Sequence, residues 1–260
     1  MLGKNELLEY RTFNDPYQIE KDYLHELILY EVYSKRYTTD SFVFKGGTAL
    51  SKFYHSGRFS EDLDFNAPGR KPEEIAEDVG RIAGAMPYKS ALAGKPATNK
   101  FGTMGAEVLI EGPRYNGKAS TLQHISFEIN TAAVLEYAPL PITQRPQYRD
   151  LEEYTALVMD MREIIAEKVR AIMSRKRRHR ERDLYDMYFL TGKEVDIKKE
   201  VVMKKLEQSH ITLSRETLKE AIASVEKSWE ELDPFVVQKL PSYERAKQQV
   251  LEALERAKLL

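Results

Sequence analysis

The chain has 260 residues, 42% hydrophobic and 31% charged, so it is long enough for one large or two modest domains with a buried core and too apolar to be disordered. The absence of cysteine excludes disulfides, thiolate zinc sites and cysteine nucleophiles. The net charge of −1 does not by itself indicate a polyanionic partner, and the five scattered histidines have no metal-binding spacing. No segment approaches the roughly 18–20 apolar residues of a membrane span. We therefore expect a soluble cytoplasmic protein with no membrane partner.

The N-terminal half predicts a mixture of helices and strands. Apolar residues at three- and four-residue steps predict helices, and short apolar or alternating runs between turn residues predict strands. The expected helices cover residues 17–35, 48–55 and 73–85. The expected strands cover residues 41–45, 59–65, 107–111 and 122–131.

The proline-bearing stretch 138–147 is the best candidate for a domain boundary, and beyond it the pattern predicts helices only. These helices cover roughly residues 150–174, 183–190, 195–208, 214–231 and 242–258. Ser214 and Ser242 are the expected N-caps of the last two. The outline is an α/β or α+β half followed by a helical half.

The triplet Gly46-Gly47-Thr48 stands between an expected strand and an expected helix. Glycines there let the backbone approach an anion, and the N–H groups that open the next helix can donate to it. The alternative is a tight strand-to-helix turn that merely requires glycine.

Asp62 and Asp64 are two residues apart on an expected strand, so their carboxylates point to one side, roughly 7 Å apart along the backbone. Like charges on one face repel unless a cation lies between them, which favours a metal site. Glu128, on the polar face of another expected strand, is a candidate third carboxylate for a two-metal site. The alternative for Glu128 is a strand residue that faces solvent.

Charge is unevenly distributed, because the segment 168–182 holds eight Lys and Arg against one Glu. This pattern favours a polyanionic partner near the segment, although a solvated turn is the alternative. The cations that follow the helix are Arg175, Lys176, Arg177, Arg178, Arg180 and Arg182. Lys168 itself lies in a helical pattern, where an exposed lysine is the alternative to a functional one, and Asp183 and Asp186 would then only favour the start of the next helix.

Four blocks together resemble the AbiEii/AbiGii toxin family of the DNA polymerase beta nucleotidyltransferase superfamily. They are EKDYLHELIL (20–29), FVFKGGTALSKFY (42–54), RFSEDLDF (58–65) and IIAEKVRAIMSRKRRHRERDLYDMYFL (164–190). They stand in the family's order over about two thirds of the chain, whereas residues 191–260 lie outside the match and Glu128 lies in a weakly patterned part of it. The resemblance implies an α+β fold, with a mixed-sheet nucleotidyltransferase core over residues 1–147 and a helical C-terminal domain, 148–260, that completes the active-site cleft.

The resemblance also implies site residues. The family's metal motif falls on Ser60, Asp62 and Asp64, its motif lysine on Lys168, and its later aspartate on Asp183, with Asp186 as the alternative. The implied nucleotide-binding residues are Gly46, Gly47, Thr48, Lys52, Arg58 and Ser60. Asp62 and Asp64 would hold Mg²⁺ or Mn²⁺, Lys168 would neutralise triphosphate charge, and Asp183 would orient Lys168 or the nucleophile.

Members of the family resemble type IV toxins that are paired with a separately encoded antitoxin, and some transfer nucleotides from NTPs to the 3′ ends of tRNAs. We therefore expect a metal-dependent nucleotidyltransferase whose acceptor hydroxyl, on a tRNA, attacks the α-phosphate of an NTP. The basic stretch would contact the tRNA or the triphosphate. The alternatives are transfer to a hydroxyl of a protein or small molecule, and a non-catalytic module that binds NTP or RNA.

Overall fold

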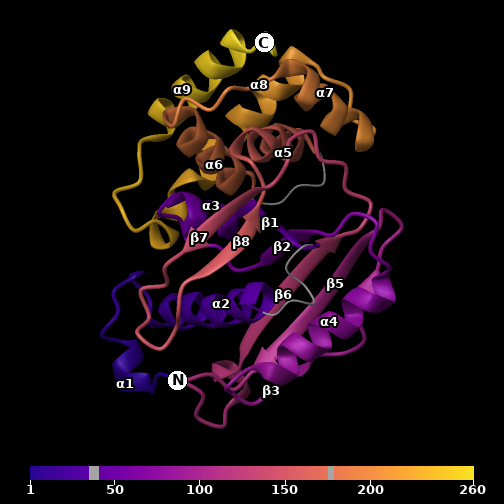
Figure 1. The fold of residues 1–260 in the computed structure, drawn as a ribbon. Coiled ribbons are helices and arrows are strands. Elements are labelled where there is room, and N and C mark those ends of the chain that lie inside the picture. The colour runs from indigo at the N-terminus through magenta and orange to yellow at the C-terminus, as the bar shows by residue number, and fades with distance from the viewer. Residues whose placement is uncertain (35–40, 175–178) are drawn as a thin grey trace. The chain divides into compact units, whose positions relative to one another are not determined.

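The computed structural model describes residues 1–34, 41–174 and 179–260, which form two compact units (Figure 1). The N-terminal unit comprises Met1–Val134 and Pro139–Met159, and the C-terminal unit comprises Leu135–Ala138 and Asp160–Leu260. The boundary expected between residues 147 and 148 precedes this division by one strand, β8 (Tyr154–Val158), which pairs with the sheet of the N-terminal unit.

A mixed sheet forms the centre of the N-terminal unit. Its strands within the described residues are β1 (Val43–Lys45), β2 (Leu63–Asn66), β3 (Ser90–Leu92), β4 (Ala97–Thr98), β5 (Thr103–Ile110), β6 (Gln123–Asn130), β7 (Leu140–Gln144) and β8. They are ordered β3-β5-β6-β2-β1-β8-β7, with β4 paired to β5. The pairs β2–β6 and β1–β8 are parallel and the other pairs antiparallel.

One face of this sheet carries the hydrophobic core of the unit. The helices are α1 (Lys4–Leu7), α2 (Pro16–Ser34), α3 (Gly46–Tyr54) and α4 (Pro72–Ala85), with a 3₁₀ turn at Ala119–Thr121. Apolar side chains of α2 and α4 share one buried cluster with Phe44, Phe65 and Phe127 of the strands. Because side chains alternate along a strand, Asp64 and Glu128 lie on the opposite face.

The C-terminal unit is helical. Its helices within the described residues are α5 (Met161–Met173), α6 (Arg180–Gly192), α7 (Lys199–Gln208), α8 (Arg215–Ala223) and α9 (Tyr243–Arg256), with a 3₁₀ segment at Glu226–Phe235. Ser214 and Ser242 cap α8 and α9 by accepting backbone N–H groups, as the sequence predicts. In the described part of the chain, no helix is both long and apolar enough to cross a membrane.

The expected fold class, an α+β mixed sheet with flanking helices followed by a helical region, is confirmed. Several element predictions are wrong. The expected boundary stretch 138–147 contains β7, and the expected helix 214–231 ends at Ala223 and is followed by a 3₁₀ segment. Residues 59–62 form a connection rather than the start of β2, and the segment 154–158, expected within a helix, is β8. Tyr154, Ala156 and Val158 of that segment are buried in strand alternation, and pairing with β1 and β7 satisfies its backbone.

Candidate active site

The glycine pair lies where β1 passes into α3. Lys45 is extended and precedes the helix, and Gly46 has φ of 77°, a left-handed conformation that non-glycine residues rarely adopt. This turn directs the first backbone N–H groups of α3, a helix of nine residues, out of its N-terminus. Such a terminus is a favourable place for an anion.

Side chains from the next segment pack directly on the glycines. A Cβ at Gly46 would overlap the carboxylate of Asp64, and a Cβ at Gly47 would overlap the guanidinium of Arg58 and lie 2.8 Å from the Oγ of Ser60. Arg58 also donates to the carbonyl of Phe59 at 3.0 Å. Gly46 is therefore favoured both by its backbone conformation and by the close approach of Asp64, whereas a side chain at Gly47 would displace Arg58 and Ser60.

The acidic residues are held on both sides of the turn. Asp62 is exposed and precedes β2, so the strand expected to carry both carboxylates carries only Asp64. The backbone carbonyl of Asp62 accepts the hydroxyl of buried Thr48 at 2.6 Å. Asp64 is half-buried on β2 and lies in register with Glu128 on the parallel strand β6. The structure thus brings Asp64 next to Gly46 and Glu128, and uses Thr48 to connect α3 to Asp62.

The carboxylates of Asp62 and Asp64 could supply only part of the ligands of a metal ion. Among the described residues, no three His, Asp or Glu side chains are grouped so that they could hold a metal ion alone. Carboxylate oxygens at Asp62 and Asp64 nevertheless match Mg²⁺, which protein sites commonly hold through one or two carboxylates while substrate phosphates and water complete the shell. The residues fit a metal that arrives with a phosphorylated substrate.

Lys168 lies in the C-terminal unit, where α5 packs against α6. Its Nζ is 3.1 Å from the Oδ1 of Asp183 and 2.7 Å from the Oδ2 of Asp186. Both aspartates are fully buried and the side chain of Lys168 is 11% exposed, so Lys168 is not a solvated surface lysine. The lysine contacts both candidate aspartates rather than one of them.

The basic stretch is only partly described. Arg175, Lys176, Arg177 and Arg178 lie outside the described residues. Arg180 donates to the carbonyl of Ser174 at 2.9 Å and to Ser224 at 3.2 Å, and the guanidinium of Arg182 lies 5.4 Å from the ring centre of Phe235. These two arginines therefore make contacts within the C-terminal unit.

Comparison with known proteins decides the family. The profile of the nucleotidyltransferase AbiEii toxins of type IV toxin–antitoxin systems matches residues 27–256, most of the chain. The chain belongs to the AbiEii toxin family. No curated protein matches the sequence significantly.

Solved structures share the fold of this AbiEii family member at low sequence identity. MenT4, a nucleotidyltransferase toxin from Mycobacterium tuberculosis H37Rv, is 18% identical with a TM-score of 0.65, over 96% of this chain and 89% of its own. A candidate nucleotidyltransferase from H. pylori is 19% identical with a TM-score of 0.62, over 94% and 96%. JHP933 from Helicobacter pylori is 20% identical with a TM-score of 0.57, over 95% and 94%. The family profile reaches residue 256, so the expectation that residues 191–260 lie outside the match is wrong.

Lys52 of this AbiEii family member does not face the glycine turn. Its Nζ lies 2.7 Å from Asp22 and 3.0 Å from Glu26, both on α2. Burial opposes the charge of Lys52, but the two carboxylates outweigh that effect and raise its pKa. These contacts indicate that Lys52 joins α3 to α2.

Helix α2 contributes residues that sequence reasoning did not assign to the site. His25 is buried, and its Nε2 lies 3.1 Å from the carbonyl oxygen of Glu61, the residue before Asp62. Burial, together with the positive charges of Lys52 and Lys21, holds the pKa of His25 well below its usual value. Neutral His25 carries its proton on Nε2 if it donates to the carbonyl of Glu61. This hydrogen bond fixes the segment before β2 that carries Asp62. The only signal in the sequence was the polar content of the block EKDYLHELIL.

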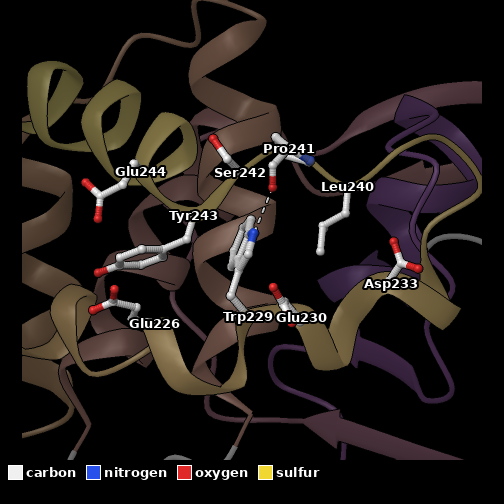
Figure 2. Close-up of a pocket in the computed structure, with 9 residues that line it drawn as sticks. All are labelled: Glu226, Trp229, Glu230, Asp233, Leu240, Pro241, Ser242, Tyr243 and Glu244. Atoms are coloured by element: carbon white, nitrogen blue, oxygen red, sulfur yellow. Dashed lines mark hydrogen bonds between the residues drawn. The ribbon is translucent and has the colours of Figure 1, made fainter.

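A cavity in the C-terminal unit is acidic and carries none of the expected site residues. Figure 2 shows Glu226, Glu230, Asp233 and Glu244 around it, and Trp229 donating to the carbonyl of Pro241 at 2.8 Å. All of its lining residues belong to the C-terminal unit, and none of them lies at the glycine turn.

Proposed function

We propose that this AbiEii toxin transfers a nucleotide from an NTP to the 3′-terminal hydroxyl of a tRNA, in a reaction that depends on a divalent metal ion. The observation that carries the proposal is the packing of Asp64, Arg58 and Ser60 on Gly46 and Gly47. This packing brings together a helix N-terminus suited to phosphate, a cation, a hydroxyl and a carboxylate suited to a metal ion. Membership of the family supports the reaction class.

The triphosphate is assigned to the glycine turn. The backbone N–H groups of Gly47 and Thr48 and the hydroxyl of Ser60 donate to phosphate oxygens in this proposal. Arg58, whose side chain is covered, adds positive charge at the turn. Lys168 is assigned to the triphosphate, and Asp183 and Asp186 to orienting it, on the family resemblance.

Asp62 and Asp64 would hold the metal, and Glu128 on β6, in register with Asp64, would lie next to that pair. When bound, Mg²⁺ would offset negative charge on the phosphates and so favour attack at phosphorus. Buried His25 and Thr48 bond to the backbone carbonyls of Glu61 and Asp62, which fixes the backbone that carries the Asp62 carboxylate.

The reaction is an in-line displacement. The acceptor oxygen forms a bond to the α-phosphorus, the bond from that phosphorus to the bridging oxygen breaks, and pyrophosphate leaves. The hydroxyl proton passes to water or to a carboxylate of the site. A separately encoded antitoxin would be the protein partner that restrains this activity.

Incubation of the purified chain with total tRNA and each α-labelled NTP in turn tests the function. We expect label on RNA, removed by ribonuclease and not by protease, and only when a divalent cation is present. Label on protein would replace the tRNA acceptor by a protein hydroxyl. NTP binding without any transfer would make the chain a non-catalytic module.

Asp64→Asn sharpens this test. Loss of one carboxylate should lower kcat/KM by about a thousandfold, equivalent to ~4 kcal/mol, because the metal and the triphosphate lose a charge between them. Glu153→Gln, which makes the same charge change at an exposed carboxylate, should leave activity unchanged. Stabilisation by Mg²⁺ and NTP in a thermal melt should vanish in Asp64→Asn alone, and an undiminished shift would remove Asp64 from the metal site.

A further inference from the structure

Four residues form one row across the open face of the sheet. Lys45 on β1 pairs with Asp64 on β2, Asp64 with Glu128 on β6, and Glu128 with Gly105 on β5. Paired residues of neighbouring strands project to the same face. The row therefore runs from the glycine turn, through the proposed metal carboxylates, to a position with no side chain.

A groove of about 420 Å³ lies at that end of the row. Its walls include Glu128 and Ser126 of β6, Gly105 and Glu107 of β5, and the connection at Gly94 and Lys95. This volume falls within the range of small-molecule sites. Because Glu128 belongs both to the row and to the groove, the groove opens directly beside the proposed metal carboxylates.

Gly105 shapes the groove. Glycine within a strand weakens it, and it often marks a place where another group approaches the backbone. A Cβ at Gly105 would meet no atom within 4 Å, and its φ is not in the positive range, so neither packing nor backbone conformation requires glycine. A side chain at position 105 would fill the part of the groove that lies above Gly105.

The strand order assigns a role to this space. The proposed phosphate turn lies at the β1 and α3 side of Asp64, and the groove lies at the β6 and β5 side. In an in-line transfer, the attacking oxygen and the leaving pyrophosphate stand on opposite sides of the α-phosphorus. If the triphosphate is anchored at Gly46 and Gly47, the acceptor would approach the α-phosphorus from the side of the groove.

We propose that this groove receives the terminal nucleoside of a polynucleotide acceptor, an inference that rests on the proposed function. Carboxylates at Glu128 and Glu107 and the hydroxyl of Ser126 accept hydrogen bonds from ribose hydroxyls. Exposed Lys95 supplies a cation for the adjoining phosphodiester. The bond changes are those of the proposed transfer, and the groove adds only the position of the attacking hydroxyl.

Gly105→Val tests the groove without a loss of folding. Valine favours strands and fills the space above the backbone, so the variant should be at least as stable as wild type. Its affinity for a fluorescent single-stranded RNA with a free 3′ hydroxyl, measured by anisotropy without NTP, should fall about tenfold or more. Gly84→Ala, at an exposed glycine of α4 whose added Cβ would also meet nothing, should bind RNA like wild type.

Two further measurements locate the contact. Lys95→Met should reduce the slope of log affinity against log salt by about 0.7, whereas Lys89→Met, at an exposed lysine paired with Glu111, should leave the slope unchanged. An RNA that ends in a 3′-phosphate should bind more weakly than the hydroxyl form, because the phosphate would face Glu128. Equal binding of the two RNAs would overturn the assignment to the terminal nucleoside.

Binding and transfer separate this inference from the proposed function. Wild-type affinity in Gly105→Val, or an equal loss of the thermal shift produced by Mg²⁺ and NTP, would overturn the groove as the acceptor site. Groove-dependent RNA binding in a protein that transfers no nucleotide would retain the binding site and reject the proposed reaction.

Discussion

Two buried lysines, one in each unit, each form ion pairs with two carboxylates of a neighbouring helix. Lys52 lies between Asp22 and Glu26 of α2, and Lys168 lies between Asp183 and Asp186 of α6. Each stands in a sequence block that resembles a nucleotidyltransferase motif. The two surroundings nevertheless differ.

The carboxylates around Lys52 belong to a closed network. Asp22 also accepts the hydroxyl of Tyr148 at 2.7 Å, and Glu26 accepts the hydroxyl of Tyr154 at 2.8 Å. The side chain of Lys52 is 4% exposed, against 11% for Lys168. A lysine near a glycine motif can therefore be a structural link between helices, and the partners of each lysine are better evidence than its position in a motif.

The largest expected effect is loss of stability in Lys52→Met. Removing one member of a buried ion cluster leaves two carboxylates uncompensated, which should lower the free energy of unfolding by about 3–5 kcal/mol. Urea unfolding followed by circular dichroism measures this change. Adding Asp22→Asn and Glu26→Gln to the variant should recover part of the loss. A change below about 1 kcal/mol would contradict the structural role of Lys52.

Lys168→Arg should affect turnover more than folding. The substitution keeps the charge beside Asp183 and Asp186, but a planar guanidinium does not replace a compact ammonium at phosphate. We expect kcat/KM to fall about tenfold to a hundredfold while the free energy of unfolding changes by about 1 kcal/mol or less. Arg170→Lys, at a residue of α5 that lies two positions away, is the matched control. Full activity in Lys168→Arg would place Lys168 with Lys52 as a structural lysine.

Buried His25 should make the free energy of unfolding depend on pH. The pKa of His25 is well below 6.5 when folded, because of burial and the nearby cations Lys52 and Lys21, so the unfolded chain binds a proton first as the pH falls. Its contribution to stability is complete above about pH 6.5 and is lost below it, at about 1.4 kcal/mol per pH unit, until the folded pKa is reached. Urea unfolding at pH 7.5 and 5.5 should show a smaller difference for His25→Gln than for wild type. The same difference in both proteins would assign the effect to other groups.

Much of the fold was predictable because local patterns decide it. The proline that opens α4 and the serines that cap α8 and α9 each act within a few residues of chain. The alternation of β6 likewise predicted which of its side chains would be buried. β8 was missed because its five residues precede α5 closely, and only pairing with β1 and β7 distinguishes it from helix.

The features of the candidate site also separate into those that local sequence predicts and those that tertiary structure decides. The sequence alone determined the glycine turn between strand and helix and the family, since these depend on residue types at short spacing. Tertiary structure alone decided that Lys52 turns to α2, that Lys168 meets both Asp183 and Asp186, and that Gly105 leaves a groove beside Glu128. Those contacts join residues far apart in the chain. The burial of a charge and its partner are properties of the packed fold, so no local pattern of residues encodes them.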